Sequence, residues 1–177
     1  MSSAFIEVIG ITPAARFPKC PSDHPYAQLC EIDKLCIPDP NPDIHDVLEV
    51  CLTVVICSFK IIHTPVGNKA VIDGKKQIKV TFVANDHCQS VHTAQFEVPF
   101  CTFILLGRIN KKIAQICSAV EDITVKCPTN RCVTTASIIF FCPLFQTEAD
   151  CAPDPATGND DCQVNNGGCP TQGYYEE

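Results

Sequence analysis

Several segments between residues 44 and 145 place apolar side chains at every second position, and this alternation constrains the fold more than any other feature. From Ile78 to Phe82, three apolar residues alternate with two polar ones, so one face of this segment is apolar and the other is wet. Other segments rich in Val, Ile, Thr and Phe span 51–62, 96–100, 116–127 and 133–142. The pattern predicts an all-β fold: a β-sandwich, or a partly open barrel, of about six to eight mostly antiparallel strands.

One dipeptide inside this region has strong turn chemistry. Asp73 and Gly74 form a pair that is favoured in the type I′ turns of two-residue β-hairpins. We therefore expect a hairpin over residues 69–83, with its turn at these two residues.

The flanks of the β region differ from it in composition. Residues 1–43 contain seven prolines, which remove ladder hydrogen bonds and disfavour helix, so we expect an extended N-terminal arm. The arm holds one strand-like run, which we expect to add to the sheet edge of a neighbouring chain through Phe5, Ile6, Val8, Ile9 and Ile11. Residues 146–177 form a tail rich in Cys, Gly and Pro. The sequence thus predicts an arm (1–43), a β-domain (44–145) and a tail (146–177).

Charge is concentrated in the tail. Residues 1–147 hold 13 acidic and 13 basic side chains, whereas residues 148–177 hold seven acidic side chains and no Lys or Arg. A neutral body with an acidic tail creates no field that attracts nucleic acid or anionic membranes. No run approaches the roughly 18 apolar residues that span a bilayer. The N-terminus has no basic segment followed by an apolar one, so we expect no secretory signal. From the charge distribution we expect no nucleic-acid partner, and from the short apolar runs we expect no membrane insertion.

Fourteen cysteines stand out in a chain of 177 residues. Such a density is typical of small secreted disulfide scaffolds, but this chain is larger and has no visible export signal. Cysteines on an extended arm and tail are well placed to join neighbouring chains. The candidate intersubunit disulfide residues are Cys20, Cys30, Cys36, Cys151, Cys162 and Cys169. Buried free thiols are an alternative that we expect for some strand positions, namely Cys57, Cys101 and Cys117.

Metal binding and catalysis have weaker signals. Zinc sites usually contain close pairs such as C-x2-C, and this chain has none. A loop containing His87, Cys88 and His92 is the remaining arrangement that could hold a metal, and ordinary turn and surface roles are the competing interpretation. The chain also has no nucleophile elbow, phosphate loop or zincin motif. We therefore expect a protein that is not an enzyme and that has no cofactor.

The middle of the chain resembles the SPOCS domain, which occurs in coat and morphogenesis proteins of spore-forming bacteria. The resemblance covers roughly residues 42–145, and its segments are PDIHDVLEV (42–50), TPVGNKAVIDGKKQIKVTFVA (64–84), VHTAQFEVPFCTFILL (91–106) and the weaker VEDITVKCPTNRCVTTASIIF (120–140). The family-motif residues are Pro65, Gly67, Asp73, Gly74, Val91, His92, Phe96, Pro99 and Phe100. The resemblance implies a structural or protein-interaction module without catalytic activity.

The resemblance also accounts for many cysteines in a chain without an export signal. A spore-layer protein is made in the reducing cytosol of the mother cell and meets oxidising surroundings when that cell lyses, so its thiols can be bridged later. We expect a self-assembling, disulfide-linked component of a spore surface layer: coat, exosporium sheet or appendage. Its expected partners are further copies of itself, with other coat or exosporium proteins as additional candidates. The alternatives are an adaptor that docks a morphogenesis protein without polymerising and, less favoured, a metal-binding protein.

Overall fold

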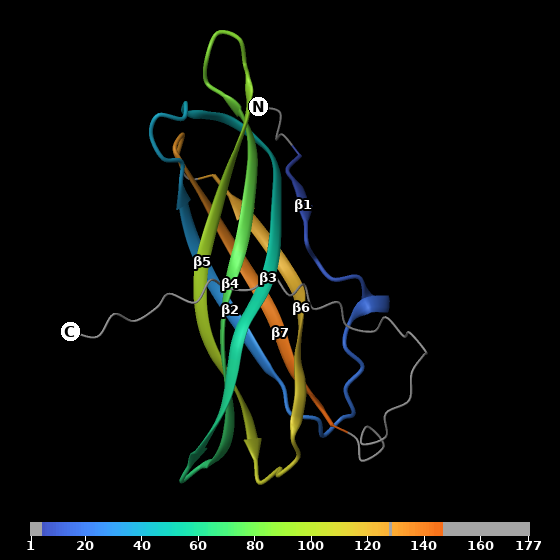
Figure 1. Cartoon of the computed structure of the whole chain (residues 1–177). Coiled ribbons are helices and arrows are strands. Elements are labelled where there is room, and N and C mark those ends of the chain that lie inside the picture. Colours follow the sequence, from blue (N-terminus) through green and yellow to red (C-terminus); the bar gives the residue numbers. More distant parts are fainter. Residues whose placement is uncertain (1–4, 128, 147–177) are drawn as a thin grey trace, which may run out of the picture.

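The computed structural model describes residues 5–127 and 129–146, and these form two stacked β-sheets (Figure 1). Apart from the 3-10 helix η1 (Ala14–Arg16), the described elements are all strands. They are β1 (Glu7–Ile9), β2 (Ala27–Cys36), β3 (Ile44–Thr64), β4 (Gly67–Ala84), β5 (Val91–Gly107), β6 (Ile113–Lys126) and β7 (Cys132–Phe145). The predicted all-β fold is confirmed, and of the two architectures the sandwich is correct, because the sheets are separate and no barrel closes.

The two sheets differ in size and pairing. Sheet A has the order β1-β3-β4-β5, in which β1 pairs parallel with β3 and the other pairs are antiparallel. Sheet B has the order β2-β7-β6 and is antiparallel throughout. The strand that begins sheet A and the strand that begins sheet B both come from the first 43 residues. The N-terminal part of the chain is therefore built into both layers.

The prediction that all of residues 1–43 form an extended arm is wrong for β2. Ten consecutive pairs, from Ala27↔Phe141 to Cys36↔Cys132, join β2 to β7. Leu35 is buried in the core, and Ala27 and Leu29 pack against it. Before Ala27, the described residues contain only the three-residue elements β1 and η1, and the β-domain includes β2. The predicted tail lies outside the described residues from position 147 onward.

The predicted hairpin turn at Asp73 and Gly74 is also wrong. Both residues lie in the middle of β4, which pairs without interruption with β5 at this level. Gly74 is needed for another reason: a Cβ there would lie 2.5 Å from the Val55 carbonyl oxygen and 2.5 Å from the ring of Phe100. The β3–β4 turn is instead at Thr64–Gly67, where the Thr64 hydroxyl donates to the Gly67 carbonyl oxygen at 2.7 Å.

The interior of the sandwich contains two apolar clusters with a polar level between them. One cluster is built around Val50, Ile78, Val80, Phe82 and Val133. The other is built around Ala70, Ile72, Ile104, Ile139 and Phe141. The side chains that separate them are buried or partly buried polar groups from three strands: Glu31, Asp33, Lys76, Thr135 and Ser137.

A third, smaller cluster lies on the outer face of sheet B, under the N-terminal segment. It consists of Cys117, Ala119, Phe140 and Cys142, with Phe17 and Cys20 packed against it. The ring of Phe17 lies 5.0 Å from that of Phe140, and Tyr26 stacks on the same ring at 5.5 Å. The residues between β1 and β2 therefore cover part of the outer face of sheet B.

Candidate functional site: cysteines of the two outer faces

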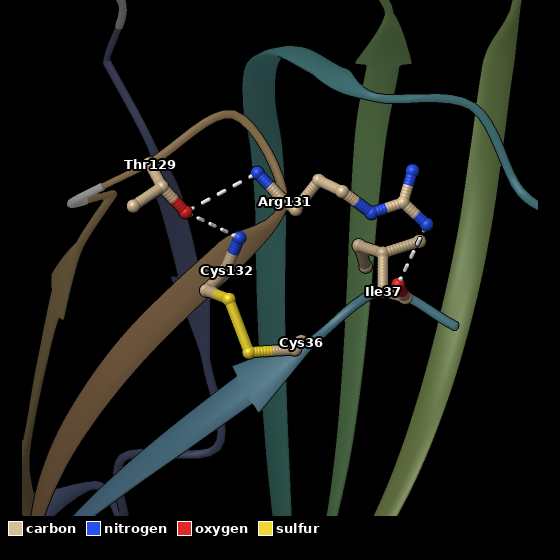
Figure 2. The surroundings of a disulfide bond; sticks show 5 residues. All are labelled: Cys36, Ile37, Thr129, Arg131 and Cys132. Carbon is tan, nitrogen blue, oxygen red and sulfur yellow. Dashed lines mark hydrogen bonds between the residues drawn. A yellow bond between two sulfur atoms is a disulfide. The ribbon is translucent and has the colours of Figure 1, made fainter. Parts of the chain in front are cut away.

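Cys36 and Cys132 form a disulfide within the chain, at the end of the β2–β7 pair (Figure 2). They are direct partners in the sheet register, with Cα atoms 4.1 Å apart. The prediction that Cys36 links two chains is therefore wrong. The sequence could not show this, because the pairing depends on β2 lying beside β7, and β2 itself was not predicted.

Arg131 ties the chain that follows this disulfide to the β6–β7 connection. Its Nη2 donates to the Ile37 carbonyl oxygen at 3.0 Å (Figure 2). The backbone N–H of Ile37 also donates to the Arg131 carbonyl oxygen, at 2.8 Å. Its guanidinium also forms ion pairs with Asp39 and Asp43, at 2.8 and 2.6 Å. These carboxylates hold the pKa of Arg131 above its usual value, mainly through the hydrogen bond to Asp43. Arg131, Asp39 and Asp43 thus form a charged cluster next to the disulfide.

Cys30 remains available on the outer face of sheet B. It lies on the edge strand β2, is exposed, and is not disulfide-bonded. Its neighbour on the same outward face, Ile32, has 74% of its surface exposed. The outer face of β2 therefore carries an exposed apolar side chain next to an exposed thiol.

Cys101 occupies the corresponding position on sheet A. We expected it to be a buried packing thiol, and that prediction is wrong, because Cys101 is exposed on the outer face of the edge strand β5. It pairs with Asp73 across the β4–β5 ladder. The hydrogen bond to the Asp73 carboxylate, with smaller contributions from burial and charge, raises the pKa of the Cys101 thiol. Thiolate formation is thereby disfavoured, and so is attack on a disulfide.

Two loop cysteines are also exposed and not disulfide-bonded. Cys88 lies in the β4–β5 loop, which projects beyond the sheets at one end of the sandwich (Figure 1), and Cys127 follows β6. Neither was among the predicted linking residues. The alternation along β5 could have revealed Cys101, because Phe100 faces inward and its neighbour must face outward. For Cys88 the signal was its place in the expected loop with His87 and His92, whereas no sequence signal marked Cys127 as exposed.

Three thiols converge beneath the N-terminal segment. Cys117 and Cys142 are buried direct partners in the β6–β7 register, and Cys20 packs against them as a half-buried residue. Hydrogen bonds to Cys117 and Cys20, together with burial, raise the pKa of Cys142 well above its usual range. The prediction that Cys117 is a packing residue agrees with its burial. Cys20, predicted to link chains, is held against this buried pair instead.

The remaining cysteines have different environments, and Cys51 is one for which the sequence predicted no role. Cys57, expected to be a buried free thiol, is exposed and takes part in a disulfide, so that expectation is wrong. Cys51 is half-buried on β3, opposite Lys79. Cys151, Cys162 and Cys169 lie outside the described residues.

The segment predicted to pair with a neighbouring chain pairs with its own sheet. Glu7–Ile9 form β1, and Val8 lies opposite Val50 of β3. Gly10, with φ +119°, allows the chain to turn away here, because a Cβ at this position would collide with the Leu52 carbonyl oxygen. Phe5, Ile9 and Ile11 stay exposed, whereas Ile6 and Val8 pack against the core. The prediction of a strand is correct, and its sheet-edge pairing occurs within the chain.

The other family-motif residues lie in the long strands of sheet A and in the turn between β3 and β4. Pro65 and Gly67 shape the β3–β4 turn, Val91 begins β5, and Phe96 packs against the first apolar cluster. Pro99 is exposed on β5. His92 accepts or donates a hydrogen bond with the Ser90 hydroxyl at 2.8 Å and stacks on Phe82. These contacts are packing and loop contacts, and in the described part of the chain no group of three His, Cys, Asp or Glu could hold a metal ion.

Comparison with models of protein families gives a match. A family model described as "SipL, SPOCS domain" matches residues 43–127, which run from just before β3 to just after β6. No curated protein and no solved structure matches the chain. In the described residues, no helix is long and apolar enough to cross a membrane. A SPOCS domain suggests a sporulation-related role and a spore-associated location. The resemblance to the SPOCS domain family that the sequence predicted is thus confirmed over residues 43–127.

Proposed function

We propose that this protein is a structural, self-assembling component of a spore surface layer, cross-linked by disulfides between chains, and not an enzyme. The observation that carries the proposal is the position of exposed thiols on both outer faces of one rigid sandwich. Cys30 points outward from sheet B and Cys101 from sheet A, and neither is disulfide-bonded. Outward side chains of two stacked sheets point in opposite directions, so each chain offers a linking residue to two different neighbours.

Two linking faces on one chain are what extended assembly requires. A contact between one face of a subunit and a different face of the next is heterologous, and it produces rings or open filaments. The thiols at Cys88 and Cys127 add linking positions at loops. Disulfides formed after assembly then fix contacts that the chains first make non-covalently.

The raised pKa of Cys101 supports linking that follows assembly. A thiol is nucleophilic only as the thiolate, and the Asp73 carboxylate disfavours that form. Premature exchange during synthesis in a reducing cytosol is thereby slowed. Oxidising surroundings at the spore surface then supply the electron acceptor for disulfide formation.

The test compares oxidised protein on non-reducing and reducing gels. We expect ladders of multimers that collapse to monomer on reduction. The double variant Cys30→Ser/Cys101→Ser should lose most of the ladder, whereas Cys142→Ser, which removes a buried thiol, should keep it. Monomer in both lanes for the unsubstituted chain would contradict cross-linking.

Electron microscopy of the purified protein separates this proposal from its alternatives. Ordered fibres or sheets support assembly. Dispersed particles that bind a morphogenesis protein would favour the adaptor, and stoichiometric zinc in elemental analysis would favour a metal-binding protein.

A further inference from the structure

Three charged side chains meet between the two sheets. Lys76 extends inward from the central strand β4, and its Nζ lies 2.6 Å from Glu31 Oε2 and 2.6 Å from Asp33 Oδ2 on β2. The exposed fraction of the side chain is 0% for Lys76, 9% for Asp33 and 34% for Glu31. An amine on one sheet and a carboxyl group on the other are thus held in contact, at a site from which water is largely excluded.

The surroundings of this trio are unusual in a second respect. Thr135 and Ser137 on β7 lie directly opposite Asp33 and Glu31 in the sheet register. Both are fully buried, and within the described part of the chain neither hydroxyl oxygen has a hydrogen-bond partner. An unpaired buried hydroxyl destabilises a protein by about 1–3 kcal/mol. These two hydroxyls are unused hydrogen-bond donors near the charged side chains. They can stabilise negative charge that forms on a neighbouring oxygen during a reaction.

A permanent ion pair is a poor explanation for this arrangement. One ammonium group cannot neutralise two carboxylates, and a buried ion pair usually stabilises no more than apolar packing of the same volume. Reaction between the ammonium and one carboxylate removes both of their charges from the interior. We propose that Lys76 and Asp33 join in an intramolecular amide bond between the two sheets, with Glu31 moving the protons.

The reaction balances without a metal, oxidant or cofactor. One proton of the Lys76 ammonium passes through Glu31 to an oxygen of Asp33, and the nitrogen lone pair then attacks the Asp33 Cγ to form a C–N bond. A second proton from the nitrogen follows the same route to that oxygen. The Cγ–O bond breaks, water leaves, and Glu31 ends as the carboxylate it was at the start. The net change is ammonium plus carboxylate to amide plus water.

The geometry supplies the three conditions that this step needs. Contact between nitrogen and carboxylate oxygen replaces a bimolecular encounter, which gives effective molarities on the order of 10⁵ M or more. Exclusion of water favours amide over free acid and amine. The hydroxyl of Thr135, opposite Asp33, can donate to the carboxyl oxygen that remains as negative charge builds on it.

Asp33 rather than Glu31 is the partner because of its burial. Its side chain is nearly enclosed, whereas Glu31 is one-third exposed. An exposed carboxylate exchanges protons with solvent and gives the released water a way out. The amide bond would tie the edge strand β2 of sheet B to the central strand β4 of sheet A, and so lock the sandwich covalently across its layers.

The test is the intact mass of the purified full chain after complete reduction and alkylation of its cysteines. We expect a mass lower than the sequence mass by one water molecule. Trypsin should release a branched peptide that joins residues 20–34 to residues 76–79, with no cleavage after Lys76. The full sequence mass in the folded protein would overturn the proposal.

Substitutions distinguish this bond from other losses of water. Lys76→Met should restore the full mass, and Lys75→Met, on the outer face of the same strand, should keep the loss. Glu31→Gln should give the full mass, because it keeps the size of the side chain and removes the proton carrier. Asp33→Asn should still form the bond, with loss of ammonia in place of water. A loss that persists in Lys76→Met, or a branch at Glu31, would refute the assignment; the mass of the unsubstituted chain decides the proposal even where a variant fails to fold.

Discussion

Lys75 and Lys76 are neighbours on β4 and lie in opposite environments, because successive side chains of a strand point to opposite faces. Lys75 points outward and forms an ion pair with Glu97 at 2.8 Å, and the Glu97 side chain is 60% exposed. Lys76 points inward, is fully buried, and contacts Glu31 and Asp33 of the other sheet. The outer pair is screened by water, whereas the inner one is not.

This difference shows that the two faces of the sandwich have different roles. Charges on the outer face of sheet A contact water, and one of them, Asp73, sets the reactivity of Cys101. The inner charges interrupt the core and divide it into two apolar clusters. Substitutions at matched inner and outer positions therefore separate contributions to stability from contributions to assembly.

The largest difference is expected between the two lysines. Lys76→Met leaves Glu31 and Asp33 facing each other in the interior without a cation, which should lower the free energy of unfolding by about 3–5 kcal/mol. Lys75→Met removes an exposed ion pair and should change it by less than about 1 kcal/mol. Urea denaturation under reducing conditions measures both values. Equal effects would contradict the assignment of inner and outer faces.

The next comparison asks whether the Cys36–Cys132 disulfide stabilises the chain as much as the buried contacts of Lys76 with Glu31 and Asp33. Replacing both Cys36 and Cys132 by serine removes a link between residues 96 positions apart and should destabilise the chain by about 2–5 kcal/mol. Cys30→Ser, on the same face of β2, should change stability by no more than about 0.5 kcal/mol. Non-reducing urea titration provides the measurement. A double variant as stable as the unsubstituted chain would show that this disulfide does not form.

The next effect contrasts Gly74 with Asp73, the two residues wrongly predicted to form a turn. Gly74→Ala forces a methyl group against the Val55 carbonyl and the Phe100 ring, which should cost about 1–3 kcal/mol. Asp73→Ala, one residue away on the outer face, should change stability by no more than about 0.5 kcal/mol. Thermal unfolding followed by circular dichroism compares them. If the dipeptide were a surface turn, both changes would be small.

These residues show how far the sequence alone could lead. Alternation predicted the long strands of sheet A, because their inward positions are almost all apolar. The Asp-Gly pair was misread because the sequence alone does not distinguish two kinds of glycine. A glycine in a turn looks the same as a strand glycine that makes room for an aromatic ring on the next strand. Strand β2 was missed because its inward positions include Glu31 and Asp33 while Ile32 faces outward, so its alternation is inverted.

The candidate site was predictable only in part for the same reason. Cys30 was predicted to be a linking residue, and it is exposed. Cys36 was predicted to link two chains because its partner strand was unknown. Cys101 was predicted to be buried, although the alternation along its strand placed it on the outer face. Contacts between distant strands, such as Lys76 with Asp33, have no local signal in a sequence.

The smallest effect separates reactivity from stability on the outer face. The Asp73 carboxylate raises the pKa of Cys101, so at pH 8 less of this thiol is ionised than for an ordinary cysteine. Asp73→Asn removes the charge, so the pKa should fall and the thiolate fraction at a given pH should rise. We expect alkylation of Cys101 to become a few-fold faster at pH 8, with its pH profile displaced to lower pH and stability unchanged. Mass spectrometry of the peptide that contains Cys101 measures the rate, and Cys30, which lies on the other sheet, is the internal control. An unchanged rate would mean that Asp73 does not restrain this thiol, and faster cross-linking in the same variant would connect that restraint to assembly.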